Sequence, residues 1–294
     1  MKRLLALVLV LLLTGCGAAS APEPPQVNSP PPPVAVQPAF PEPEETFCYQ
    51  VESYVSENAV CSDDGTPLAA YHFDLPALSV LREDGTVIEE AKTPAEEHAL
   101  EMTTAFNERF GKWAAAEEFD GLVQSAQTDF AFRQEEGIEW FGGYELELVT
   151  SVYQTEHLVS VAGSYYNYTG GAHPNTWQLG WNYDLATGSF FGPEGLAADG
   201  ASFQEAIHQE LIRQAEAVAA EHETAPEVFF WEDYKEILAN WSSYAVFFDK
   251  SGMTVVFSPY ELACYAAGTQ VFHVTYDWLK PHLSEYGCEV LELA

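Results

Sequence analysis

Residues 164–188 constrain the fold most strongly, because two runs of alternating aromatic residues flank the turn sequence Gly-Gly-Ala-His-Pro-Asn. In the second run, large apolar residues occupy every other position: Trp177, Leu179, Trp181 and Tyr183. A spacing of two is typical of a strand with one buried face. Within the turn, Gly170 and Gly171 can adopt a positive φ without a Cβ clash, and Pro174 restricts the residue before it. These residues therefore predict a hairpin in an antiparallel sheet.

The residues before this hairpin predict four strands and two helices. The strands are expected at residues 47–54, 68–80, 144–152 and 157–168. The first helix begins after Thr93, where a Thr-Pro-Ala-Glu sequence forms a capping pattern. Its apolar residues recur every three or four positions and form one stripe: Ala99, Met102, Phe106, Phe110 and Trp113. Such a stripe is typical of a helix that packs on a sheet, and a second helix is expected over residues 117–134.

The residues after the hairpin predict a second group of helices and strands. A capping pattern at Ser202 begins a helix that extends to about Glu221. Further strands are expected at residues 244–248, 253–257 and 271–276, and short helices at residues 231–240 and 277–284. Strands grouped around a few helices, without regular alternation, favour an α+β fold. We expect two small, closely associated modules, each with antiparallel strands packed against a helix.

The N-terminal segment, residues 1–16, is expected to be a lipoprotein signal peptide. Two basic residues precede an apolar run over residues 4–13, which is shorter than the roughly 20 residues that span a membrane. Leu-Thr-Gly-Cys at residues 13–16 resembles the lipobox of bacterial lipoproteins, in which Cys16 is lipidated; the alternative is an ordinary secretory signal. Residues 17–45 are rich in proline and glutamate and predict an extended linker. The expected location is the extracellular face of the bacterial membrane, held there only by the lipid.

Four cysteines follow the lipobox: Cys48, Cys61, Cys264 and Cys288. An even number in an exported protein predicts two disulfides, for which three connectivities exist. The local pairs are favoured, because Cys48 and Cys61 flank a predicted hairpin while Cys264 and Cys288 bracket the C-terminal strand and helix. A zinc site would require paired Cys-x-x-Cys spacing, which these cysteines lack.

The charge is strongly negative, with 45 acidic and 11 basic residues and a formal net charge of −34. Such a field repels nucleic acids and anionic lipid surfaces and favours basic partners; the alternative is that acidity only keeps a surface protein soluble. The sequence shows no metal-ligand spacing and no nucleophile motif, so it predicts no enzyme, metal or cofactor. Paired carboxylates for glycoside cleavage remain an alternative, because so many acidic residues produce such pairs by chance.

Two motifs carry a resemblance to a known family. GGAHPNT at residues 170–176, followed by NYDLATG at residues 182–188, resembles the signature of extracellular domains related to the lysozyme-sensing RsiV anti-sigma factors. The same two modules, the domains of unknown function DUF4163 and DUF3298, precede the catalytic domain of some peptidoglycan deacetylases. FSPYELACYAAG at residues 257–268 resembles the motif of the later module. The resemblance implies a DUF4163-like module over residues 46–185 and a DUF3298-like module over residues 186–294.

The resemblance implies a cell-surface binding protein without catalytic activity, whose partner is lysozyme or another basic protein that acts on the cell wall. Residues at and near the turn are the expected contacts: Tyr166, Tyr168, Gly170, Gly171, His173, Asn175 and Trp177. For His173 the alternative is a turn residue bonded to nearby backbone. Tyr260 is expected to pack on the core, and a surface contact is the alternative for it. A lipid anchor in place of a membrane helix predicts no direct signalling to a sigma factor. Alternative functions are a peptidoglycan- or carbohydrate-binding module and an unrecognised cell-wall hydrolase.

Overall fold

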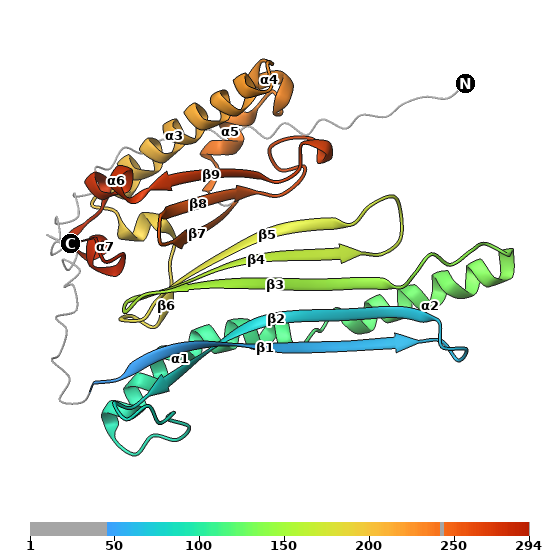
Figure 1. Ribbon diagram of the computed structural model, residues 1–294, viewed down its shortest axis with the longest axis horizontal. Helices are drawn as coiled ribbons and strands as arrows, with labels where there is room; N and C mark the ends of the chain where they lie inside the picture. Colours follow the sequence, from blue (N-terminus) through green and yellow to red (C-terminus); the bar gives the residue numbers. More distant parts are fainter. Residues whose placement is uncertain (1–45, 242–243, 294) are drawn as a thin grey trace, which may run out of the picture. The chain divides into compact units, whose positions relative to one another are not determined.

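The computed structural model describes residues 46–241 and 244–293 (Figure 1). The signal peptide at residues 1–16, the lipidation site Cys16 and the linker at residues 17–45 lie outside the described residues. Within the described ranges, no helix is both long enough and apolar enough to cross a membrane.

The larger sheet has six strands in chain order. They are β1 (Cys48–Cys61), β2 (Pro67–Leu81), β3 (Tyr144–Gln154), β4 (Leu158–Tyr168), β5 (Asn175–Asp184) and β6 (Ser189–Phe190). Neighbouring strands run antiparallel with one exception, because β2 and β3 pair in parallel from Ala69 opposite Tyr144. A parallel pair needs a long connection, and the two helices supply it.

The connecting helices are α1 (Pro94–Ala114) and α2 (Phe119–Glu136), and both contact β2 (Figure 1). α1 begins as predicted, with the Thr93 hydroxyl accepting a hydrogen bond from the Glu96 amide at 3.2 Å. Its stripe buries Phe106 and Phe110 against Tyr183 and Trp181 of β5. The apolar face of α1, which repeats every 3.6 residues, thus packs on the apolar face of the strands, which repeats every two residues.

The smaller sheet has the order β7 (Ala245–Asp249), β8 (Gly252–Phe257) and β9 (Gln270–Thr275), all antiparallel. Its main helix, α3 (Gly200–Glu221), is capped by the Asp199 carboxylate, so the expected cap at Ser202 is wrong by three residues. Shorter helices complete this part: η1 (Pro193–Leu196), α4 (Pro226–Phe229), α5 (Tyr234–Ala239), η3 (Tyr265–Ala267), α6 (Tyr276–Leu279), η4 (Lys280–His282) and α7 (Glu285–Val290).

The two sheets are joined where β7 packs on β4 and β5. The buried Asn182 side chain donates to the Val246 carbonyl at 3.0 Å, and the Phe248 amide donates to the Ser160 hydroxyl at 2.7 Å. Ser160 in turn donates to the Asn182 side-chain oxygen at 2.8 Å. These bonds satisfy backbone groups of β7 that a sheet edge would otherwise leave unpaired. The predicted α+β fold with two packed modules is confirmed.

The predicted disulfides are absent, since all four cysteines among the described residues are free thiols. Cys48 and Cys61 are the first and last residues of β1, which places them roughly 40 Å apart at strand spacing, far beyond disulfide reach. Cys264 lies in the connection between β8 and β9, whereas Cys288 lies in α7 beyond the other end of that sheet (Figure 1). Both local pairings are therefore wrong. The hairpin expected between Cys48 and Cys61 is one continuous strand, and the connection that holds Cys264 lies at the opposite end of the smaller sheet from α7, which holds Cys288.

Candidate binding site

The hairpin of β4 and β5 forms as predicted, with Asn167 opposite Asn175 at its end. Gly170 and Gly171 have φ values of 80° and 112°. These are the positive values expected for the two glycines of the turn. The Tyr168 hydroxyl donates to the Gly171 carbonyl at 3.2 Å. The turn is thus held in shape by its own residues.

His173 connects this turn to the second motif. Its Nδ1 donates to the Pro174 carbonyl at 2.8 Å, which confirms the expected bond to nearby backbone. Its ring also stacks on Tyr265, with centroids 4.0 Å apart and planes within 19°. The Tyr260 hydroxyl lies 3.4 Å from Nε2. The two sequence motifs therefore meet at three rings, His173, Tyr260 and Tyr265, which we name the aromatic junction.

Tyr260 is exposed, in contrast to the core position considered for it from the sequence. It keeps 52% of its surface accessible and has a φ of 74°, which is rare for a residue with a side chain. Its amide donates to the Ala263 carbonyl and its carbonyl accepts from the Trp231 indole, so the unusual backbone is fixed on both sides. A strained, exposed aromatic residue is a feature found at contact sites.

The loop that carries Tyr260 is anchored to the hairpin through Ser258. Its buried hydroxyl accepts a hydrogen bond from the Gln178 amide of β5 at 2.9 Å. The Ser258 amide donates to the Glu261 carboxylate three residues later, so Glu261 serves as a loop cap. The junction is consequently positioned by both sheets.

The expected contact residues do not form one surface. Tyr166 and Tyr168 lie opposite Glu147 and Glu145 of β3 and share their face of the sheet. Trp177 is 41% exposed, but it lies opposite Tyr165 and stacks on it at 5.8 Å, on the face that α1 covers. Because side chains of a strand alternate between faces, Trp177 is separated from the aromatic junction.

Tyr166 has an acidic and aromatic environment. Its pKa is raised, chiefly by burial and then by nearby groups: Glu145, Tyr168, Glu147 and Tyr265. Tyr265, Glu145 and Glu147 were not among the predicted contacts, although Tyr265 lies within the second motif and the glutamates mark the exposed face of β3. Asn175 is exposed beside the turn.

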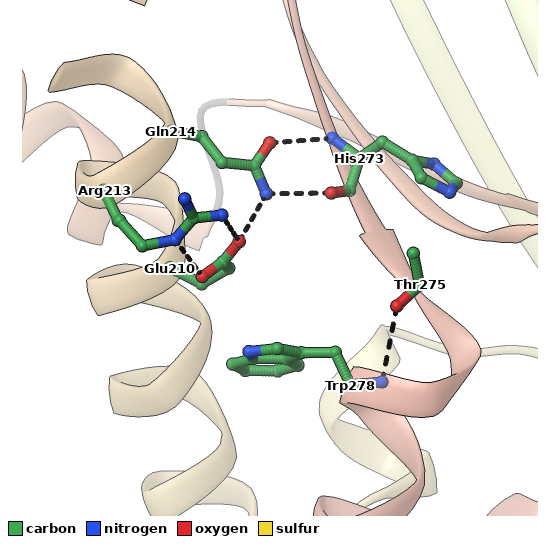
Figure 2. Close-up of polar contacts among 6 residues, drawn as sticks. All are labelled: Glu210, Arg213, Gln214, His273, Thr275 and Trp278. Carbon is green, nitrogen blue, oxygen red and sulfur yellow. Dashed lines mark hydrogen bonds and ion pairs between the residues drawn. The ribbon is translucent and has the colours of Figure 1, made fainter. Parts of the chain in front are cut away.

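A cleft of about 500 Å³ lies between α3 and β9, and its polar groups bind one another (Figure 2). The Gln214 amide donates to the His273 carbonyl at 2.8 Å and accepts from the His273 amide at 3.1 Å. It also donates to Glu210, whose carboxylate binds Arg213 and whose pKa is lowered chiefly by that residue. These contacts attach α3 to the edge strand β9. Within the described ranges, no group of three His, Cys, Asp or Glu residues could hold a metal.

A known protein family matches only the second of the two motifs that meet at the aromatic junction. The match to the family described as "Protein of unknown function (DUF3298)" runs from η1 to α6. Residues 194–277 form a DUF3298 domain. The DUF3298 domain therefore contains the loop with Tyr260 and Tyr265, whereas the turn with His173 precedes it. No curated protein matches the chain.

Two solved structures resemble the chain. One is a DUF3298-family member from Bacteroides fragilis NCTC 9343, with a TM-score of 0.56 and 11% identity over 85% of this chain and 100% of that chain. The other is a DUF3298-family protein from Pseudomonas aeruginosa PAO1, with a TM-score of 0.46 and 15% identity over 81% of this chain and 95% of that chain. The first likeness shows a shared fold that extends beyond the DUF3298 domain itself.

Proposed function

We propose that the protein is a non-catalytic binding protein of the bacterial cell surface, anchored by a lipid at Cys16, whose partner is basic. C-type lysozyme is the first candidate, from the resemblance to the RsiV-like proteins with DUF4163 and DUF3298 modules. The observation that carries the proposal is the aromatic junction, where His173, Tyr260 and Tyr265 from two distant motifs form one surface. Aromatic anchors in a fixed geometry are typical of the residues that dominate protein interfaces.

The charge supports a basic partner. The net charge of −34 attracts cationic proteins over long range, and Glu145 and Glu147 lie beside Tyr166 near the junction. Steering by such a field speeds association and weakens as salt is added. Packing on the rings is short-ranged and persists at physiological salt.

The test is binding of the purified full-length chain to C-type lysozyme at low and near-physiological salt, with an unrelated basic protein of similar size as the control. Saturable binding to lysozyme alone at physiological salt is expected. Equal binding to both proteins would mean that charge alone accounts for the binding. No binding at either salt concentration would overturn the lysozyme proposal.

The junction itself is tested with Tyr260→Gly, because glycine accepts the φ of 74° and the fold is preserved. We expect the affinity for lysozyme to fall about tenfold or more, as for an interface anchor. Phe132→Ala is the matched control, since Phe132 of α2 is 55% exposed and lies in a helix on the other face of the sheet. Equal losses of lysozyme affinity in both variants would mean that the aromatic junction is not part of the interface.

A glycan-binding module is the second candidate, and the exposed Trp177 ring favours it. The Trp177 ring stacks on Tyr165 with an angle of 28° between the planes, and its exposed side can serve as a stacking surface for a sugar. Sugar stacking responds little to salt, in contrast to a charge-steered protein complex. Salt-independent binding of peptidoglycan fragments, lost in Trp177→Ala and retained in Tyr260→Gly, would favour this candidate.

A further inference from the structure

We propose a second site, independent of the aromatic junction, that binds a sugar carrying a carboxylate. It is a cavity of about 610 Å³ between α1, the start of α2 and the sheet, a volume typical of small-molecule sites. The residues on which the argument depends are Arg109, Lys112, Trp113, Glu108, Glu117 and Phe190.

Two cations line this cavity without ion-pair partners among the described residues. Arg109 and Lys112 lie three residues apart on α1, so both project to the same side of the helix. Arg109 instead lies over the Phe190 ring, with its Cζ 5.1 Å from the centroid. By contrast, the described arginines outside this cavity each contact a carboxylate: Arg82, Arg133 and Arg213. In so acidic a chain, two unpaired cations in one cavity can hold a carboxylate.

The aromatic rings of the cavity pack on the core. Trp113 packs edge-on against Phe73 at 5.9 Å and against Tyr165 at 5.2 Å, and it is half-buried. Phe190 stacks on Phe106 with planes within 12°. Rings held in place by the core offer a flat apolar surface at little entropic cost on binding. A ligand with one flat, apolar face is therefore favoured.

The acidic residues of the cavity select among anions. Glu108 and Glu117 also line the cavity and are exposed, as are Arg109 and Lys112, while the Glu118 carboxylate accepts a hydrogen bond from the Tyr165 hydroxyl at 2.6 Å. Carboxylates accept hydrogen bonds and repel an ion that has no donors. Acids without hydroxyl donors are thus disfavoured, whereas an acidic sugar supplies hydroxyl donors to the glutamates and a carboxylate to the cations.

The test compares methyl β-D-glucuronide with methyl β-D-glucoside, in which an uncharged hydroxymethyl group replaces the carboxylate, in an NMR titration of the full-length chain. The Trp113 indole signal, assigned with Trp113→Phe, should shift and saturate at millimolar glucuronide and remain unchanged with the glucoside. Arg109→Gln combined with Lys112→Gln should weaken glucuronide binding by about tenfold or more, from the loss of charge-assisted hydrogen bonds. Lys280→Gln, which removes an exposed lysine elsewhere, should leave it unchanged.

Four results would overturn the proposal. Three of them are no saturable shift with the glucuronide, equal binding of both glycosides, and equal affinity of the double variant and the original chain. An equal loss in Lys280→Gln would do the same by showing that only net charge matters. Arg109→Lys combined with Lys112→Arg keeps both charges and should retain binding, which separates recognition from damage to the fold.

Discussion

Glu96 is a buried carboxylate that ties the start of α1 to the end of β2. Only 5% of its surface is accessible, and its two oxygens accept hydrogen bonds from the Arg82 guanidinium and the Lys92 amide, both at 2.6 Å. The hydrogen bond from Arg82 is the main reason that the Glu96 pKa is lowered, followed by that from Lys92. A carboxylate whose pKa is lowered in the fold stabilises it above the ordinary value and ceases to do so in acid.

We predict that Glu96→Gln lowers the urea midpoint of unfolding at neutral pH, because the ion pair between Arg82 and Glu96 is then lost. The difference from the original chain should shrink as the pH falls below the ordinary glutamate value of 4.5 and through the lowered pKa. Glu97→Gln is the control, since Glu97 lies in the same helical turn and is exposed. A difference that is the same at neutral and acid pH would contradict this account.

Among the elements, the contact of β7 with β4 and β5 sets the arrangement of the two sheets. It depends on a close approach at Gly180, where an added Cβ would lie 2.3 Å from the Val246 carbonyl oxygen. No side chain fits at that distance, so the strands must separate or the backbone must move. The hydrogen bonds of Asn182 and Ser160 to β7 require the same approach.

We predict that Gly180→Ala destabilises the protein by about 1–3 kcal/mol, the usual cost of overpacking a core. Gly121→Ala on α2 is the matched control, because nothing lies within 4 Å of its added Cβ and alanine favours a helix. Urea unfolding of the two variants provides the comparison. Equal stability of Gly180→Ala and the original chain would mean that β7 does not approach β5 so closely.

At the scale of the whole molecule, tyrosines of both hydrophobic cores share one response to alkali. Burial raises the pKa of Tyr183 to about 12. Burial also raises the pKa of four others: Tyr165, Tyr244, Tyr276 and Tyr286. A group whose pKa is raised in the fold stabilises it fully below the ordinary value, here 10.0, and loses that contribution as the pH rises through the folded value.

We therefore predict that the free energy of unfolding falls steeply between about pH 10 and pH 12, with Tyr183 alone contributing roughly 2 kcal/mol. Urea unfolding followed across this range, together with tyrosinate absorbance, measures the effect. Tyr183→Phe should flatten part of the decline, though it also removes the bond to the Met102 carbonyl. A constant urea midpoint up to pH 12 would contradict the prediction.

Local patterns predicted most helices and hairpins, because their signals lie within a few residues. The cap at Thr93 and the turn at Gly170 and Gly171 are examples. The parallel pairing of β2 with β3 has no such signal, since it depends on the path of the two helices between them. The same limit applies to the site: His173 was predicted, but its contact with Tyr260 joins residues 87 positions apart. Spacing misled at Cys48 and Cys61, because the strand that was expected to end at residue 54 continues to Cys61.

The expected boundary at residue 185 also has a consequence for how such chains can recombine. β6 pairs Phe190 with Tyr183, and Leu158 of β4 packs in the same core as α3 and β8. A cut at residue 185 would remove the edge strand β6 from the larger sheet. It would also expose the face of β7 that β4 and β5 now cover. The two sheets therefore cannot be exchanged separately between proteins, and a graft of either one would expose apolar surface that the other now buries.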